Sequence, residues 1–280
     1  MKEQTACGIA RFPPRRAASM SSRPCHTLSE FNTDRLTVPV TTMDGWHHDL
    51  IAGLGAANTM EAIFAKFADA AESLGFEYCC YGIRIPLSIK HRRILIFDNY
   101  PSGWTARYRE QNYCAIDPTV ALAGAYLHTA LVWSDQLFAA APALWHEAQS
   151  YGLKFGWSQS ARDQSGITGF LSLARAEVPL QQAEILAKSV RFAWLAQTGH
   201  AAVVKNCFAE LVPGVSSQLT LREREVMLWT AEGKTALEIG SILNMSRRTV
   251  NFHVANVIKK LNCTNKLQAV VKAVVLGLMP

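Results

Sequence analysis

Apolar residues along the chain recur with a helical period in some stretches and with a strand-like pattern in others. Between Gly45 and Gly75 they recur every three or four positions, which predicts helix. Runs rich in aromatic and β-branched residues follow at Tyr78–Ile85 and Arg93–Phe97, and they predict two strands. Further helices are expected at Trp104–Tyr113 and Pro118–Leu127.

The same mixture of patterns continues to about residue 208. A helix is predicted at Leu144–Tyr151, with Gly152 as its C-cap. Strands are expected at Phe155–Gln159 and Gly169–Ala174, and a long amphipathic helix over Leu180–Phe208. Because strands and helices alternate, we predict an α/β N-terminal domain, an α-β-α sandwich around an antiparallel sheet.

Two segments without this periodicity divide the chain. Residues 1–42 are rich in Ser, Pro, Arg and Thr, and they are expected to form a flexible N-terminal tail. Residues 211–218, with Pro213 and Gly214, are expected to form a linker. These boundaries predict an N-terminal domain at 43–210 and a C-terminal domain at 219–280.

The C-terminal segment predicts four short helices. Thr220 and Glu223 form a capping box before the first helix, and Thr235 and Ser246 cap the second and third. The fourth is expected over residues 266–276. Two helices joined by a three-residue turn, the second longer and basic, predict a small all-α helix-turn-helix domain.

The third of these helices has two distinct faces when its residues are wound at 100° each. One face is apolar: Val250, Val254, Val257, Ile258 and Leu261. The opposite face carries hydrogen-bond donors, positive charge and an aromatic ring: Arg248, Asn251, Phe252, Ala255, Asn256 and Lys259. An amphipathic helix with a solvated basic face is the simpler interpretation, but the capping and the turn favour a helix that enters the major groove.

The distribution of charge supports a DNA partner. Residues 214–280 contain nine Lys or Arg and four Asp or Glu, a net charge of +5, whereas residues 41–213 have a net charge of −2. A basic module on a near-neutral body fits a polyanionic partner. The predicted DNA-contacting residues are Lys234, Thr235, Ser246, Arg248, Thr249, Asn251, Phe252, Ala255, Asn256, Lys259 and Lys260.

The run EGKTALEIGSILNMSRRTVNFHVANVIKKL closely resembles the DNA-binding domain of LuxR-type regulators, although Met227 replaces the usual Leu. The resemblance implies that the chain is a homodimer which binds an inverted repeat in double-stranded promoter DNA. It also implies that the fourth helix can act as a dimerisation element. A stripe of small apolar residues could serve this role or pack within the domain: Ala269, Val270, Ala273, Val274 and Leu278.

Residues 99–120, NYPSGWTARYREQNYCAIDPTV, combine several aromatic residues with Asp117. This mixture fits an apolar ligand site with a few oriented polar groups. An aromatic core in which Asp117 caps the next helix is the simpler interpretation from composition alone.

This segment resembles the acyl-homoserine-lactone-binding domain of quorum-sensing LuxR regulators, through the pattern Tyr100, Trp104, Tyr108 and Asp117-Pro118. The resemblance implies that Trp104 donates to the lactone carbonyl and that Asp117 accepts the amide N–H. Other implied roles are donation to the acyl carbonyl by Tyr100 and Ser172, a contact from Thr119 to a ligand oxygen or a water, and aromatic walls from Tyr108 and Trp133. Aliphatic lining of the acyl tunnel is expected from Ile83, Leu95 and Leu171.

The resemblance also has departures. One extra residue separates Asp117 from Trp133, compared with some members of the family, and Ser160 stands where many have Pro. Neither removes a polar anchor. We therefore expect a ligand-responsive transcription regulator whose effector is an N-acyl-homoserine lactone. A solo regulator that responds to another small amide or lactone is the alternative.

Other classes of protein have little support in the sequence. A phospho-receiver would need an early acidic cluster, and an ATPase a GxxxxGK[ST] loop; neither pattern is found. Seven cysteines without a CxxC pair, and scattered histidines, predict no metal site, no catalytic residues and no cofactor. A lactone-hydrolysing enzyme is the alternative from a different class. Because no signal peptide or membrane span is evident, we expect a cytoplasmic protein with no membrane partner.

Overall fold

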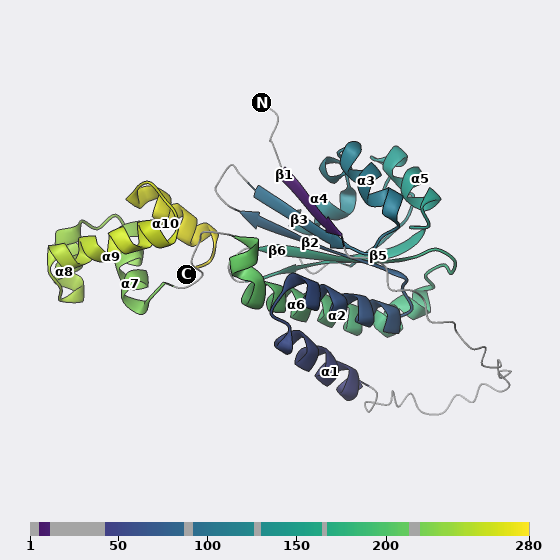
Figure 1. The fold of residues 1–280 in the computed structure, drawn as a ribbon, viewed down its shortest axis with the longest axis horizontal. Coiled ribbons are helices and arrows are strands. Elements are labelled where there is room, and N and C mark those ends of the chain that lie inside the picture. Colours follow the sequence, from purple (N-terminus) through teal and green to yellow (C-terminus); the bar gives the residue numbers. More distant parts are fainter. Residues whose placement is uncertain are drawn as a thin grey trace.

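A computed structural model describes residues 6–11, 43–86, 92–125, 130–163, 167–212 and 219–279. Its elements form a sheet with helices on both faces, followed by a group of short helices (Figure 1). Of the linker predicted over residues 211–218, residues 213–218 lie outside the described residues. The helix before it, α6 (Gln182–Leu211), ends three residues later than the sequence predicted.

The strands form one six-stranded sheet in the order β1-β3-β2-β6-β5-β4. Their bounds are β1 Ala6–Arg11, β2 Tyr78–Pro86, β3 Arg92–Asp98, β4 Ala130–Val132, β5 Phe155–Arg162 and β6 Thr168–Arg175. All pairings among β2 to β6 are antiparallel, which confirms the predicted sheet for five strands.

The prediction of a tail without regular structure over residues 1–42 is wrong at Ala6–Arg11. This strand pairs in parallel with β3, so that Ala6 lies opposite Arg93 and Arg11 opposite Asp98. The segment Ala-Cys-Gly-Ile-Ala-Arg has too little alternation to predict a strand. Its pairing uses backbone groups that the edge of β3 would otherwise leave unpaired, and a side-chain pattern does not reveal this.

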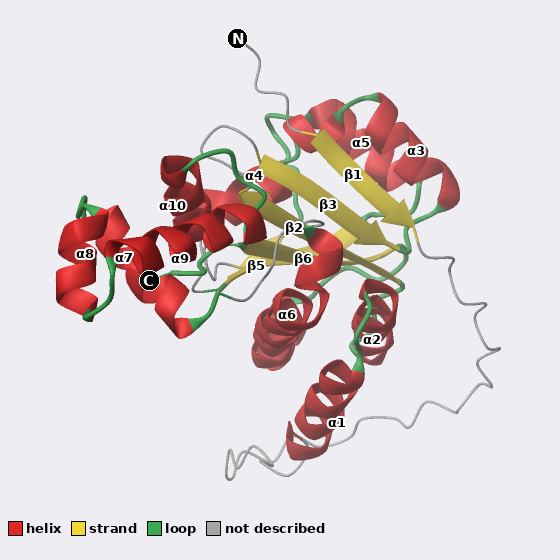
Figure 2. Ribbon diagram, turned by 60° about the vertical axis from the view of Figure 1, so that its left-hand side comes forward, coloured by secondary structure: helices red, strands yellow, loops and turns green. Residues whose placement is uncertain are grey.

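Two layers of helices cover the sheet (Figures 1 and 2). One face is covered by α2 and α6, with α1 beside them; the other carries α3, α4 and α5. The bounds are α1 Met43–Ala56, α2 Met60–Ser73, α3 Ser102–Glu110, α4 Pro118–Ala125 and α5 Pro142–Ser150. The predicted α-β-α sandwich is therefore confirmed.

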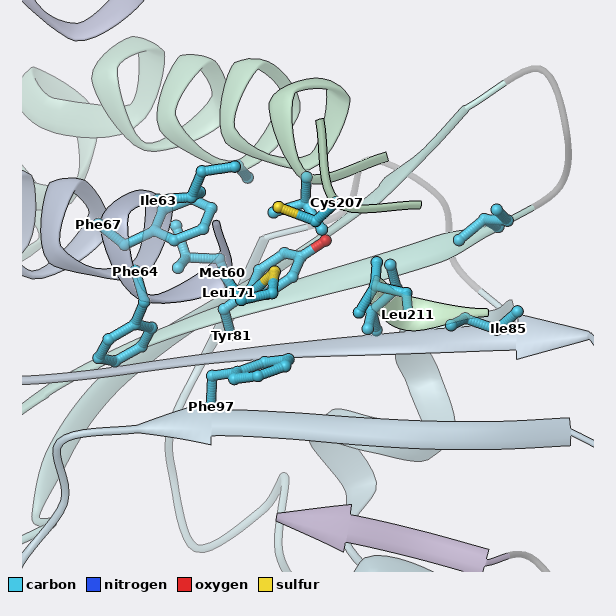
Figure 3. Packing of buried hydrophobic residues seen from close by; sticks show 14 of the residues in the cluster. Met60, Ile63, Phe64, Phe67, Tyr81, Ile85, Phe97, Leu171, Cys207 and Leu211 are labelled. Carbon is cyan, nitrogen blue, oxygen red and sulfur yellow. The ribbon is translucent and has the colours of Figure 1, made fainter. Parts of the chain in front are cut away.

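Alternation along the strands separates two apolar clusters. Tyr81 and Leu171 are buried between the sheet and helices α2 and α6 (Figure 3). Their neighbours Cys80 and Phe170 belong to the cluster on the other face, together with residues of α3 and α5. The strand period of two imposes this division, because successive side chains point to opposite faces.

Four helices form the C-terminal part: α7 Leu221–Ala231, α8 Ala236–Leu243, α9 Arg247–Lys260 and α10 Lys266–Val275. The capping box of Thr220 and Glu223 is confirmed, as are the caps at Thr235 and Ser246. Asn244 ends α8 in the left-handed conformation, with φ 53°, and turns the chain into α9. The predicted helix-turn-helix is confirmed.

Candidate functional site

A cavity lies between the sheet and the helices α3, α4 and α5. It holds about 580 Å³ of space free of protein atoms, including the part that opens to solvent. All seven residues that the sequence predicted as ligand contacts line it: Tyr100, Trp104, Tyr108, Asp117, Thr119, Trp133 and Ser172. The remaining lining is mostly apolar: Cys80, Ile96, Asp98, Thr105, Val120, Phe138, Leu144, Ala148, Leu153 and Phe170.

Local periodicity explains how distant residues reach this cavity. Trp104 and Tyr108 lie four residues apart on α3, so they share one face of the helix. Ser172 on β6 lies opposite Cys80 of β2 on one side and Ser158 of β5 on the other. The sheet therefore forms the floor of the cavity, and α3 forms part of its wall.

The expected lining by Ile83, Leu95 and Leu171 is wrong. All three belong to the cluster that packs against α2 and α6 on the opposite face of the sheet. The register makes the reason plain, since Leu171 lies directly before Ser172, which faces the cavity. A resemblance in sequence located the correct strands, but a shift of one residue along a strand changes the face.

Asp117 is the polar centre of the cavity. Its Oδ1 accepts hydrogen bonds from the Thr119 backbone N–H at 2.8 Å and from Thr119 Oγ1 at 2.7 Å. Its Oδ2 accepts from the Tyr108 hydroxyl at 2.8 Å. Burial in the cavity raises the pKa of Asp117 above its usual value, while the hydrogen bonds from Thr119 and Tyr108 act in the opposite direction.

These bonds change two roles that the resemblance implied. Tyr108 is more than an aromatic wall, because its hydroxyl orients the Asp117 carboxylate. The Thr119 hydroxyl uses its proton on the same carboxylate, so it can only accept from a ligand or a water. Asp117 is thus held in one orientation before any ligand arrives.

Tyr100 and Trp104 supply the donors near this carboxylate. Burial raises the pKa of the Tyr100 hydroxyl well above its usual value, so this hydroxyl keeps its proton as a donor. Trp104 is 3% exposed and stacks near Tyr113, with ring centroids 6.1 Å apart. In the part of the chain that the structure describes, no residue accepts a hydrogen bond from its indole N–H.

Trp133 and Ser172 are linked through a residue that the sequence did not single out. Trp133 Nε1 donates to Ser158 Oγ at 2.8 Å, and Ser158 Oγ lies 2.7 Å from Ser172 Oγ. Trp133 packs directly over Gly156, where a Cβ atom would lie 2.2 Å from the ring. Glycine at this position is therefore needed for the indole to reach Ser158.

Asp98 is a second carboxylate at the cavity that the sequence analysis missed. It is 2% exposed and accepts from the Tyr100 backbone N–H at 3.1 Å and from Thr105 Oγ1 at 3.0 Å. The strand period places Asp98 on the same face as Ile96, and that signal could have identified it. Its bonds fix the start of α3 and thereby the position of Trp104.

The second candidate site is the exposed face of α9. Val250 and Val257 are fully buried, as the apolar face predicted. On the opposite face the exposed residues are Arg248, Thr249, Asn251, Phe252, Ala255 and Lys259, whereas Asn256 is half-buried. Phe252 is 61% exposed, which is unusual for a large aromatic ring and fits a surface that binds another molecule.

The other predicted DNA contacts lie at helix starts or within the module. Thr235 and Ser246 are exposed but serve as N-caps, and Lys234 is half-buried just before Thr235. Lys260 is half-buried and donates to Glu223 Oε2 at 2.7 Å. This ion pair stabilises the module, so Lys260 is less available to a phosphate than the exposed Lys259.

Comparisons with known proteins agree with this geometry. The family model of the autoinducer binding domain matches residues 59–203, and that of the bacterial regulatory proteins of the LuxR family matches residues 217–273. The chain belongs to the LuxR family of autoinducer-binding transcription regulators of quorum sensing. Its DNA binding is accordingly ligand-responsive.

Individual relatives cover most of the chain. The transcriptional activator protein SolR of Ralstonia nicotianae is 46% identical over 217 residues, 78% of this chain and 92% of SolR. The crystal structure of Escherichia coli SdiA matches with a TM-score of 0.71 at 31% identity, covering 84% of this chain and 98% of that one. SdiA in complex with octanoyl-rac-glycerol matches with a TM-score of 0.70 at the same identity, covering 84% and 95%.

The described residues contain no group of three or more His, Cys, Asp or Glu that could hold a metal ion. Among the described helices, none combines the length and the apolar character that crossing a membrane requires.

Proposed function

We propose that the cavity binds an N-acyl-homoserine lactone, and that ligand binding controls the attachment of a homodimer to an inverted repeat in promoter DNA. The observation that supports this ligand is Asp117, a carboxylate in a mostly apolar cavity that Tyr108 and Thr119 hold in one orientation. A fixed acceptor of this kind matches an amide N–H and gives a strong charge-assisted hydrogen bond. The protein acts in the cytoplasm, where it reaches DNA.

The remaining polar groups complement the other oxygens of such a ligand. Trp104 donates its indole N–H to the lactone carbonyl, and Tyr100 and Ser172 donate to the acyl carbonyl. The acyl chain lies along the apolar lining, which includes Phe138 and Leu153. An apolar cavity with a few convergent polar groups is the usual form of a small-molecule site.

A second ligand class has a specific observation in its favour. SdiA, a relative of known structure, was solved with octanoyl-rac-glycerol, an acyl ester without an amide N–H. In this alternative the Asp117 carboxylate accepts from a ligand hydroxyl. The two classes differ in the group that Asp117 recognises, and they share the apolar tail.

The ligand can be identified by mass spectrometry of the small molecule that purifies with the full chain. Cells are given a panel of acyl-homoserine lactones that differ in chain length and 3-oxo substitution. We expect one lactone to be enriched with the wild type and lost with Asp117→Ala. Recovery of an acyl glycerol instead would favour the second class, and steady lactone hydrolysis would indicate an enzyme.

The residues of α10 that can form a dimer interface differ from the stripe of small apolar residues that the sequence indicated. Ala269 and Ala273 are fully buried and pack inside the helical module. The apolar residues left on the surface of α10 are Leu267, 72% exposed, and Val274, 48% exposed, with Val270 and Val271 half-buried. Their spacing places all four on one face, which fits an isologous contact with a second copy.

Binding to DNA is tested with labelled inverted-repeat and scrambled duplexes at two salt concentrations. Asn251→Ala should cost roughly 1–3 kcal/mol on the cognate site and much less on scrambled DNA, because amide groups read base edges. Leu267→Glu should weaken dimerisation in sedimentation and, with it, binding to the inverted repeat. Equal loss on both duplexes for Asn251→Ala would show that α9 is rotated from the assigned face.

A further inference from the structure

Trp133, Ser158 and Ser172 form a hydrogen-bonded series that ends at the ligand cavity. Ser158 and Ser172 lie opposite each other on β5 and β6 and are 2% and 3% exposed. Trp133 Nε1 lies 2.8 Å from Ser158 Oγ, which lies 2.7 Å from Ser172 Oγ. Trp133 and Ser172 line the cavity, whereas Ser158 lies behind them.

The direction of these bonds follows from the protons available. An indole nitrogen can only donate, so Ser158 Oγ must accept from Trp133. Donation from Ser158 to Ser172 Oγ pairs the single proton of the buried Ser158 hydroxyl, and the proton of Ser172 then remains for an acceptor in the cavity. Donation into a hydroxyl also strengthens the bond that this hydroxyl donates onward.

The indole at the head of the series is held in place. The Trp133 backbone N–H donates to Gly156 O at 2.8 Å, and the ring lies directly over Gly156. Phe138 and Trp145 contact the ring edge-on, with centroids 6.0 Å and 6.3 Å away. Because the ring has one position, the donor at the start of the series has one direction.

We infer that Ser158 is a positioning residue which, together with Trp133, fixes the Ser172 hydroxyl as a hydrogen-bond donor to the ligand. The site therefore selects ligands with a strong acceptor, a carbonyl oxygen, opposite Ser172. This inference rests on the proposed function, and it adds a source of specificity in a residue that does not line the cavity. Without Ser158, the Ser172 hydroxyl can rotate and donate elsewhere.

The test uses the full-length protein with N-octanoyl-homoserine lactone and its thioamide analogue, in which sulfur replaces the acyl oxygen. Sulfur is a weaker acceptor than oxygen, while the N–H remains. The ratio of the two dissociation constants is measured by titration calorimetry for each variant. Dividing each ratio by that of the wild type removes the effect of the larger sulfur atom.

The wild type should prefer the amide, and Ser158→Ala should reduce that preference roughly three- to tenfold, as expected for the loss of one hydrogen bond. Trp133→Phe, which keeps an aromatic ring but removes the N–H, should act in the same direction. Ser158→Thr keeps the hydroxyl and serves as the matched control. Because Ser158→Ala and Trp133→Phe interrupt the same series, a protein with both substitutions should show little further loss of the preference.

Two results would overturn the inference. An unchanged preference for the amide in a folded Ser158→Ala or Trp133→Phe protein would refute the role of the hydrogen-bonded series while leaving the proposed function intact. Failure of the wild type to bind either compound would instead refute the proposed ligand class, and with it the role of the hydrogen-bonded series. Thermal unfolding of each variant establishes that it is folded, and Trp133→Phe keeps the test decisive if Ser158→Ala is not.

Discussion

Lys260 Nζ donates a 2.7 Å hydrogen bond to Oε2 of Glu223, joining the end of α9 to the start of α7. The Glu223 side chain is only 4% exposed, and the same oxygen accepts from the Thr220 backbone N–H at 2.8 Å. Burial acts to raise the pKa of Glu223, but the bonds from Lys260 and Thr220 outweigh it and lower the pKa. Lys260 of α9 therefore stabilises the packing of α9 against α7.

The two neighbouring lysines should separate stability from DNA binding. Lys260→Ala leaves a buried carboxylate without its cation and should cost about 1–3 kcal/mol of unfolding free energy. Lys259→Ala should leave stability unchanged, but weaken binding to all duplexes and reduce the salt slope by about one. Chemical denaturation and titration of labelled DNA measure the two effects.

The pH dependence of the unfolding free energy tests whether the ion pair between Lys260 and Glu223 causes the effect of Lys260→Ala. Because the folded pKa of Glu223 is lowered, its contribution is complete above the ordinary value of 4.5 and is lost as the pH falls through the folded pKa. The stability difference between wild type and Lys260→Ala should therefore shrink below about pH 4.5. An equal difference at all pH values would contradict the ion pair.

Ligand affinity should depend on the ionisation of Asp117. Its pKa is raised by burial, and the ligand N–H bonds the ionised carboxylate more strongly than the neutral acid, so affinity should fall as the pH decreases through the raised pKa. Asp117→Ala should cost on the order of 1.5–3 kcal/mol, and Tyr108→Phe about 1 kcal/mol. Asp117→Asn should bind without this pH dependence, measured by titration with lactone across the acid range. Normal affinity in folded Asp117→Ala would exclude the assigned contact.

Trp104→Phe tests whether the indole N–H donates to the ligand. It keeps most of the apolar volume but removes the donor, so lactones with an intact ring carbonyl should activate a reporter less well. Analogues that lack this carbonyl should lose much less. If both groups lose the same amount, Trp104 only packs against the ligand.

Gly240→Ala should destabilise the helix-turn-helix. A Cβ atom at Gly240 would lie 2.6 Å from the backbone oxygen of Met245, which cannot move without opening the turn between α8 and α9. We expect a loss of about 1–3 kcal/mol in unfolding free energy together with weaker DNA binding. Gly55→Ala, in helix α1 with no atom within 4 Å of the new Cβ, is the control and should be neutral or slightly stabilising. Similar melting of both variants would contradict the close contact.

The sequence alone determined most of the C-terminal module. Its caps at Thr220, Thr235 and Ser246 act within one helical turn, and the buried face of α9 follows from the helical period. The hydrophobic pattern predicted four of the six strands, β2, β3, β5 and β6, but not β1 or the short β4. The resemblance likewise identified seven residues that line the cavity, and five of them fall within residues 100–119, where the spacing of the family pattern is short.

Tertiary structure decided the contacts between residues that are distant in sequence. Alternation along β6 shows that Leu171 and Ser172 face opposite ways, but only the packing of α3 and α5 determines which face contains the cavity. The pairing of β1 with β3, the series from Trp133 to Ser172 and the bond from Lys260 to Glu223 all join separate elements. Local periodicity reports the conformation of one element, whereas these contacts arise only when register and packing bring two elements together.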